Sequence, residues 1–158
     1  MKQFVLFFIS LFLLGVGARS QEMYQKKVFI SSRGDSLNYR LLRPEVEKTG
    51  LQYPLVLFLH GAGERGSDNE KQLTHGGQMF LNPVNREKYP AFVLVPQCPE
   101  KDYWAYTSRP SSFIPSEMPV GQEITPVLRA VKELLDTYLD LPQVDRNRIY
   151  AVSYTHLT

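Results

Sequence analysis

Three short apolar runs, each bounded by polar or turn-forming residues, constrain the fold of this chain most strongly. They cover residues 55–59, 91–95 and 149–152, and none of them alternates regularly between polar and apolar side chains. A strand that is buried on both faces has this pattern, because helices cover both sides of a parallel sheet. The runs therefore predict an α/β fold with a central, mostly parallel sheet.

Two further segments at the beginning of the chain predict an antiparallel hairpin. Residues 24–32 have strand character, with Val28 and Ile30 on one face, and residues 33–36 (Arg-Gly-Asp-Ser) are typical of a turn. Residues 37–43 form the second arm. The hairpin therefore precedes the first of the three buried runs, which becomes the third strand of the fold.

One amphipathic helix is predicted between the second and third buried runs. Thr125 is a capping residue and Pro126 fits the first helical position. Apolar residues recur at helical spacing after them, and Leu141-Pro142 ends the pattern. A strand–helix–strand order of this kind implies a right-handed crossover in an α/β sheet.

Residues 1–20 have the pattern of a cleavable signal peptide. A positively charged start at Lys2 precedes an apolar run that is shorter than the roughly 20 residues that span a bilayer, and small residues follow it. We expect cleavage before Gln21, with cleavage before Arg19 or an uncleaved membrane anchor as the alternatives. The mature protein is then secreted or periplasmic and has no stable membrane span.

Charge and cysteine content exclude several kinds of partner and site. Lys2 and Arg19 lie in the predicted signal peptide, so 16 of the 18 basic residues remain to balance 16 acidic ones. A neutral body gives no electrostatic reason to expect nucleic acid or an anionic membrane surface as a partner. The single cysteine, Cys98, excludes an intrachain disulfide and a cysteine-rich zinc site. We expect its thiol to be buried and inert.

A glycine-rich segment follows the first buried run directly and carries the clearest chemical signal. It reads His60-Gly61-Ala62-Gly63-Glu64-Arg65-Gly66. A turn of this kind at the carboxyl end of a parallel strand lies where α/β proteins bind ligands. It would suit a phosphate-binding loop or an oxyanion hole.

Phosphate binding is the weaker of these two interpretations. The segment lacks the Gly-Lys-Ser/Thr ending of a P-loop, and polar residues follow it where a dinucleotide-binding helix would begin. In an oxyanion hole, free backbone amides bind the oxygen that becomes negative when an ester or amide carbonyl is attacked. We expect the amide of Ala62 to be the donor, with Gly61 and Gly63 permitting the turn. His60 then supports the loop by hydrogen bonds.

The segment around these glycines resembles the secreted bacterial α/β-hydrolases described as predicted peptidases. These proteins are related to polyhydroxybutyrate-depolymerase-like enzymes and to plant-biomass (feruloyl and acetyl-xylan) esterases. Residues 92–99 with Trp104, and residues 145–150, are similar to later blocks of the same family, so the resemblance spans roughly residues 24–150. It implies an α/β-hydrolase fold and cofactor-free hydrolysis of esters or peptides by a Ser-Asp/Glu-His triad.

The end of the chain departs from this family, whose nucleophile lies in a G-x-S-x-G turn. Thr155 occupies the expected serine position between two bulky residues, and Ser153 lacks the flanking glycines. Ser153 and His156 are not expected to form a catalytic pair, because a chain end does not hold catalytic geometry. We therefore expect a C-terminally truncated hydrolase whose nucleophile, acid and histidine lie beyond residue 151.

The last seven residues, 152–158, have a sequence that suggests an origin outside the gene. Their back-translation, GTC TCT TAT ACA CAT CTG ACG, resembles the transposon-end adapter used to prepare sequencing libraries. We expect residues 1–20 to be a signal peptide and residues 21–151 to be the N-terminal part of an α/β-hydrolase domain. Residues 152–158 are then a non-native tail.

Several other side chains could support or line such a site. Glu64 and Arg65 are expected to support the glycine loop, by pairing with each other or with the missing part of the domain. Tyr103, Trp104 and Tyr106 could form an aromatic wall for a sugar or phenolic group, or could cover the core. His75 is expected in an exposed loop, and the acidic and histidine residues lack metal-ligand spacing.

These observations favour an exported serine hydrolase that acts on carboxylic esters, with plant polysaccharide esters as the preferred substrate class. A serine peptidase of the same fold is the first alternative. A non-catalytic secreted binding protein that uses the aromatic segment is the second. An intact nucleophile encoded downstream would favour the hydrolases over the binding protein.

Overall fold

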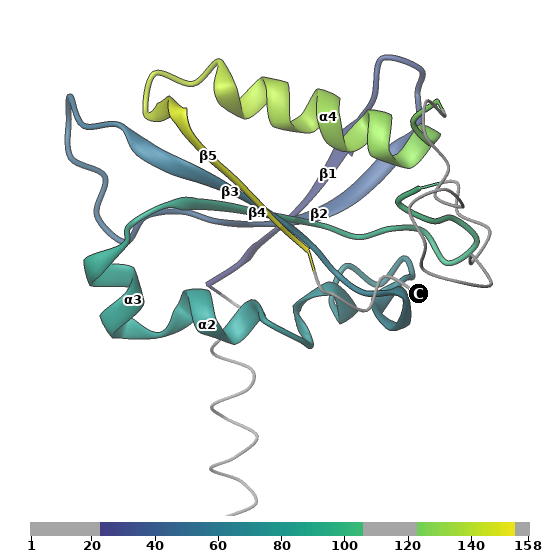
Figure 1. Cartoon of the computed structure of the whole chain (residues 1–158), viewed down its shortest axis with the longest axis horizontal. Helices are drawn as coiled ribbons and strands as arrows, with labels where there is room; N and C mark the ends of the chain where they lie inside the picture. Colours follow the sequence, from purple (N-terminus) through teal and green to yellow (C-terminus); the bar gives the residue numbers. More distant parts are fainter. Residues whose placement is uncertain (1–22, 106–122, 154–158) are drawn as a thin grey trace, which may run out of the picture.

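A computed structural model describes residues 23–105 and 123–153 of the chain. The predicted signal peptide (residues 1–20), Tyr106 and the last five residues of the predicted tail lie outside these described ranges. The described residues form one five-stranded sheet with helices on both faces (Figure 1).

The strands form a mixed sheet in the order β1-β2-β4-β3-β5. Strand β2 pairs antiparallel with both β1 and β4, whereas β3 pairs parallel with β4 and β5. The parallel centre and the N-terminal hairpin are both as predicted. The strand bounds are β1 Gln25–Ile30, β2 Ser36–Leu42, β3 Tyr53–Leu59, β4 Phe92–Pro96 and β5 Val144–Ser153.

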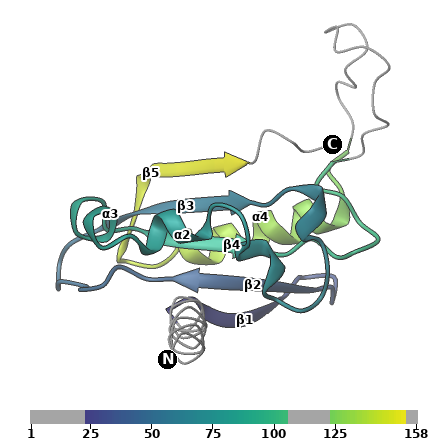
Figure 2. The ribbon, with the colours of Figure 1, turned by 90° about the horizontal axis from the view of Figure 1, so that it is seen from below.

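Helix α4 (Pro126–Leu139) covers one face of the sheet, and α2 (Gly77–Leu81) and α3 (Pro83–Lys88) cover the other (Figures 1 and 2). The Thr125 hydroxyl accepts the amide of Leu128 at 3.1 Å, and Pro126 is the first helical residue, so the predicted cap is confirmed. Two short 3-10 turns, η1 (Ala62–Glu64) and η2 (Lys71–Leu73), lie in the loop between β3 and α2.

Strands β3 and β4 contribute side chains to a separate apolar core on each face of the sheet. Leu55 and Leu57 belong to the larger core, which includes residues of α4, while Phe58 belongs to the smaller one with Leu73. Every residue of β4 is buried. Burial on both faces is the reason that these two strands have continuous apolar sequences.

Strand β5 differs from the prediction that residues 149–152 form a third buried run. Ile149 is 40% exposed and Tyr150 is 52% exposed. The strand lies at the edge of the sheet, and among the described strands only β3 pairs with it. Its sequence therefore suits a central strand, whereas its place in the described fold is that of an edge strand.

Candidate active site

The carboxyl ends of β3 and β5 lie next to each other at one end of the sheet. The parallel register pairs Leu59, the last residue of β3, with Ser153, the last residue of β5. The glycine loop that begins at His60 therefore starts beside the point where the chain leaves β5. This is the end of an α/β sheet at which ligands bind.

His60 is buried and connects the loop after β3 with the loop after β4. Its Nε2 accepts the backbone amide of Cys98 at 2.9 Å, so its Nδ1 carries the proton and donates to the carbonyl oxygen of Gly61 at 2.6 Å. Burial lowers the pKa of His60, which favours this neutral form. Both ring nitrogens are thus committed to the backbone, and the arrangement is that of a structural support.

The glycine loop presents backbone amides that the fold leaves free. Ala62 and Gly63 begin the 3-10 turn η1, and the first amides of such a turn have no acceptor within it. Among the described residues, neither amide donates a hydrogen bond to another group. Gly61 and Ala62 border a cavity of about 110 Å³, which we call the carboxyl-end cavity. Its lining is completed by Arg65, Cys98, Tyr103, Trp104 and Ala105.

Arg65 bonds to the loop itself rather than to Glu64. Its Nε donates to the carbonyl oxygen of Ala62 at 2.9 Å, and its Nη1 donates to the carbonyl oxygen of Asp102 at 3.2 Å. Glu64 instead lies 3.5 Å from the half-exposed ring of His75. Of the two pairings considered for Glu64 and Arg65, the one with each other is not formed, because the 3-10 turn places the Arg65 Nε beside the Ala62 carbonyl.

Gln97, which directly follows β4, holds the chain just after the glycine loop. Its side-chain oxygen accepts the Asn69 amide at 2.7 Å, and its Nε2 donates to Asp68 at 2.9 Å. Burial alone would raise the pKa of Asp68, but hydrogen bonds from the amides of Lys71 and Glu70 and from Gln97 lower it to about 2. The Gly66 amide also donates to the Cys98 carbonyl at 3.0 Å. The loops after β3 and β4 therefore form one bonded unit.

Cys98 borders the carboxyl-end cavity, yet its surroundings do not activate a thiol. The residue is fully buried, as predicted, and burial together with Asp102 raises the pKa of its thiol to about 12. His60 accepts the amide of Cys98 and does not bond to its sulfur. A thiol that stays protonated at neutral pH is a poor nucleophile, so Cys98 and His60 do not form a catalytic dyad.

The predicted aromatic residues divide between the core and the cavity. Trp104 donates from Nε1 to the His60 carbonyl at 3.0 Å and packs against the larger core, so it supports the loop as well as lining the cavity. Tyr103 is 57% exposed, and the Arg65 guanidinium carbon lies 4.3 Å from the centre of its ring. Tyr106 lies outside the described residues.

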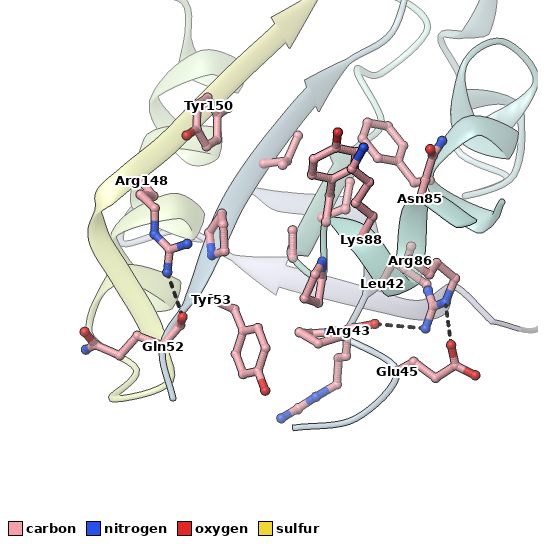
Figure 3. A pocket seen from close by; sticks show the side chains of 18 of the residues that line it. Leu42, Arg43, Glu45, Gln52, Tyr53, Asn85, Arg86, Lys88, Arg148 and Tyr150 are labelled. Carbon is pink, nitrogen blue, oxygen red and sulfur yellow. Dashed lines mark hydrogen bonds and ion pairs between the residues drawn. The ribbon is translucent and has the colours of Figure 1, made fainter. Parts of the chain in front are cut away.

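A larger hollow lies at the opposite end of the sheet, and we call it the amino-end groove. Its volume is about 690 Å³, and its walls include the first residues of β3, residues of β5 and the turns around α3 (Figure 3). Arg86 forms an ion pair there with Glu45 at 3.8 Å and donates from Nη2 to the Arg43 carbonyl at 3.3 Å, and Arg148 donates to the Gln52 carbonyl at 2.8 Å. Its arginines are therefore engaged in holding the chain together.

In the described part of the chain, no group of three or more His, Cys, Asp or Glu residues is placed to hold a metal ion. None of the helices in residues 23–105 and 123–153 is long and apolar enough to cross a bilayer.

Comparison with known proteins identifies the fold. No protein-family model and no curated protein matches the chain. The chain is 33% identical to a thermostable esterase of known structure, with a TM-score of 0.72, over 85% of this chain and 35% of that one. The ferulic acid esterase from Anaeromyces mucronatus is 14% identical over 84% of this chain and 49% of its own, with a TM-score of 0.48.

These similarities assign the described residues to the α/β-hydrolase fold, and the assignment depends on the thermostable esterase. The acylaminoacyl peptidase from Pyrococcus horikoshii is 16% identical over 88% of this chain and 20% of its own, with a TM-score of 0.42. The chain spans about a third of the thermostable esterase's length. The predicted resemblance to esterases of this fold is confirmed by the thermostable esterase.

Sequence reasoning missed two features around the site. Helices α2 and α3 were not predicted, although Asn82-Pro83 is a start signal: the Asn82 side chain accepts the amide of Val84 at 2.9 Å. The bond from Arg65 to Ala62 was also missed. No local pattern marks it, because it depends on the conformation of the turn between the two residues.

Proposed function

We propose that the polypeptide containing this chain is an exported serine hydrolase that cleaves carboxylic esters. The described residues contribute one side of its oxyanion hole. The observation that carries the proposal is the pair of free amides at Ala62 and Gly63 at the start of the turn η1, of which Ala62 lines a cavity at the carboxyl end of β3. Similarity to an esterase at 33% identity supports the same activity.

In the proposed reaction, a serine contributed by a part of the polypeptide outside the described residues attacks the ester carbonyl. A histidine accepts the proton from the serine hydroxyl and passes it to the alcohol oxygen as the carbon–oxygen bond breaks. Water then attacks the acyl carbonyl. The same histidine accepts the proton from the water and donates it to the serine oxygen as the acid is released. The Ala62 amide donates to the carbonyl oxygen while that oxygen carries negative charge, which lowers the barrier to each step.

The register of β3 and β5 supports this division of roles. Ser153 pairs with Leu59, so a nucleophile held just after β5 would emerge beside the loop that contains Ala62. His60 is excluded as the catalytic base, because its Nε2 is occupied by the Cys98 amide and its Nδ1 by the Gly61 carbonyl. The base is therefore a second histidine elsewhere in the polypeptide.

The decisive test begins with the DNA downstream of Tyr150 in the source genome. We expect an open frame that encodes a G-x-S-x-G turn, an acid and a histidine. The complete product should hydrolyse p-nitrophenyl acetate and react with a fluorophosphonate, whereas the 158-residue form should do neither. A genuine stop codon after the codon for Thr158 would contradict the proposal and favour a non-catalytic binding protein.

Substrate class and export form the finer part of the proposal. The aromatic side chains of Tyr103 and Trp104 beside the cavity suit a phenolic or sugar-linked ester. We expect methyl ferulate or acetylated xylan to be cleaved faster than a matched peptide amide, and the reverse order would identify a peptidase. N-terminal sequencing of the exported protein should begin at Gln21.

A further inference from the structure

The two free amides of the glycine loop belong to successive peptide units, and a different side chain holds each unit. The Ala62 amide shares a planar unit with the Gly61 carbonyl, which accepts His60 Nδ1 at 2.6 Å. The Gly63 amide shares a unit with the Ala62 carbonyl, which accepts Arg65 Nε at 2.9 Å. Because each unit is planar, fixing its carbonyl oxygen also fixes the direction of its amide.

Arg65 is itself anchored outside the glycine loop. Its Nη1 bonds to the Asp102 carbonyl at 3.2 Å, and its guanidinium stacks on Tyr103, so the loop after β4 determines where the cation lies. No carboxylate of the described residues pairs with Arg65. Its positive charge is therefore directed toward the Ala62 carbonyl and the carboxyl-end cavity, where a charge-assisted hydrogen bond is stronger than a neutral one.

We propose that Arg65 is a positioning residue of the oxyanion site: it holds the Ala62–Gly63 peptide unit, so that the free Gly63 amide stays aligned beside the Ala62 amide that contacts the developing negative charge. This inference rests on the proposed hydrolase function. Arg65 acts through the backbone and does not touch the substrate. Lysine cannot replace it fully, because one ammonium group does not reproduce the planar fork that bonds two carbonyls and stacks on a ring.

The test compares Arg65→Ala and Arg65→Lys with Arg148→Ala in the complete gene product. Arg148 is a matched control, because it also donates to a backbone carbonyl, that of Gln52 at 2.8 Å, but it lies at the amino-end groove. For p-nitrophenyl acetate we expect Arg65→Ala to lower kcat about 10- to 100-fold with KM changed by less than about threefold. Arg148→Ala should leave kcat within about twofold.

Two further readouts separate positioning from a general loss of structure. The affinity for a trifluoromethyl ketone, whose adduct carries an oxyanion, should fall in Arg65→Ala by about the same factor as kcat. Added methylguanidinium should restore part of the activity of Arg65→Ala and leave that of Arg148→Ala unchanged. If Arg65→Ala does not fold, Arg65→Lys carries the test: a lowered kcat at an unchanged Tm supports the inference, and wild-type kcat overturns it.

The outcomes distinguish this inference from the function on which it rests. An active wild-type enzyme with an equally active Arg65→Ala variant overturns the role of Arg65 alone. A loss of activity that follows Tm equally in the Arg65 and Arg148 variants also overturns it. Absence of wild-type turnover and of fluorophosphonate labelling overturns the proposed function and this inference together.

Discussion

The hollows at the two ends of strand β3 differ in volume and in the hydrogen bonding of their lining, and the smaller hollow has the free polar groups. The amino-end groove has about six times the volume of the carboxyl-end cavity, about 690 Å³ against about 110 Å³. Yet free backbone amides lie at the smaller hollow, while the arginines of the larger one are bonded to carboxylates and carbonyls. Volume alone would therefore point away from the end of the sheet at which we propose catalysis.

Hydrogen bonding explains why the smaller hollow is the better candidate. His60, Gln97 and Trp104 connect the loops after β3 and β4 through buried or partly buried hydrogen bonds. Such bonds fix the backbone in one conformation, which electrostatic stabilisation of a transition state requires. The amino-end groove exposes apolar side chains such as Met79, Tyr89 and Tyr150 instead. The following predictions test this contrast.

The largest effect is expected at His60. His60→Ala removes both hydrogen bonds and a buried ring, leaving the Cys98 amide unpaired, so we expect a loss of about 3 kcal/mol in unfolding free energy. Urea unfolding of the complete gene product measures it. Hydrolysis should fall at least as steeply as stability, and wild-type activity in a folded His60→Ala protein would show that the loop needs no such support.

Gly76→Ala is expected to have the next largest effect. Gly76 has a φ of +85°, and an added Cβ would lie 2.7 Å from Cζ of Phe58, whose ring is buried against Phe80. We expect a loss of about 2 kcal/mol from overpacking and left-handed backbone strain together.

Gly34→Ala is the matched control for this change. Gly34 has the same φ of +85°, but no atom lies within 4 Å of the added Cβ. Only the backbone cost of about 1 kcal/mol should remain. Thermal unfolding of both variants compares them directly, and equal losses would show that the contact with Phe58 adds nothing.

A smaller effect is expected in the pH dependence of stability. The pKa of His60 is lowered in the folded state, so the unfolded chain binds its proton more readily. The contribution of neutral His60 to the free energy of unfolding is therefore complete above about pH 6.5. It is lost as the pH falls toward the folded-state pKa, by at most about 1.4 kcal/mol per pH unit. Urea midpoints between pH 7.5 and 5 should show this slope in wild type, and a smaller slope in His60→Gln.

The smallest effect is expected in the amino-end groove. Tyr150→Ala and Met79→Ala alter exposed side chains that line it, so kcat and KM for p-nitrophenyl esters should stay within about twofold of wild type. Steady-state kinetics of the complete gene product provide the measurement. A KM raised tenfold or more would reverse the comparison and identify the larger hollow as the substrate site.

Much of the architecture is readable from local sequence signals. The apolar runs predicted β3 and β4, the turn at residues 33–36 predicted the hairpin of β1 and β2, and Thr125-Pro126 predicted the start of α4. Helices α2 and α3 were missed because each is under two turns long, so neither develops a helical period. The apolar run at residues 149–152 by itself did not show that β5 is exposed, because an apolar run does not reveal how many neighbours a strand has.

The candidate site divides in the same way. The glycine spacing after a buried strand predicted a turn at Ala62, and the structure has a turn there that lines a cavity, because backbone freedom and strand ends are local properties. The contact of Glu64 with His75 and the bond from Arg65 to the Ala62 carbonyl were not foreseen. Both depend on the 3-10 turn that the chain adopts after Gly61.

By itself, the sequence determined the order of the strands along the chain, the place of the hairpin, the start of α4 and the position of the glycine turn. Hydrophobic periodicity, capping and turn chemistry act over a few residues, so they are visible in the sequence. Only the tertiary structure decided that His60 supports Cys98 across 38 residues, that Trp104 bonds to His60 across 44, and that β5 is exposed. Such contacts follow from the order of strands in the sheet, which brings distant loops together at one end.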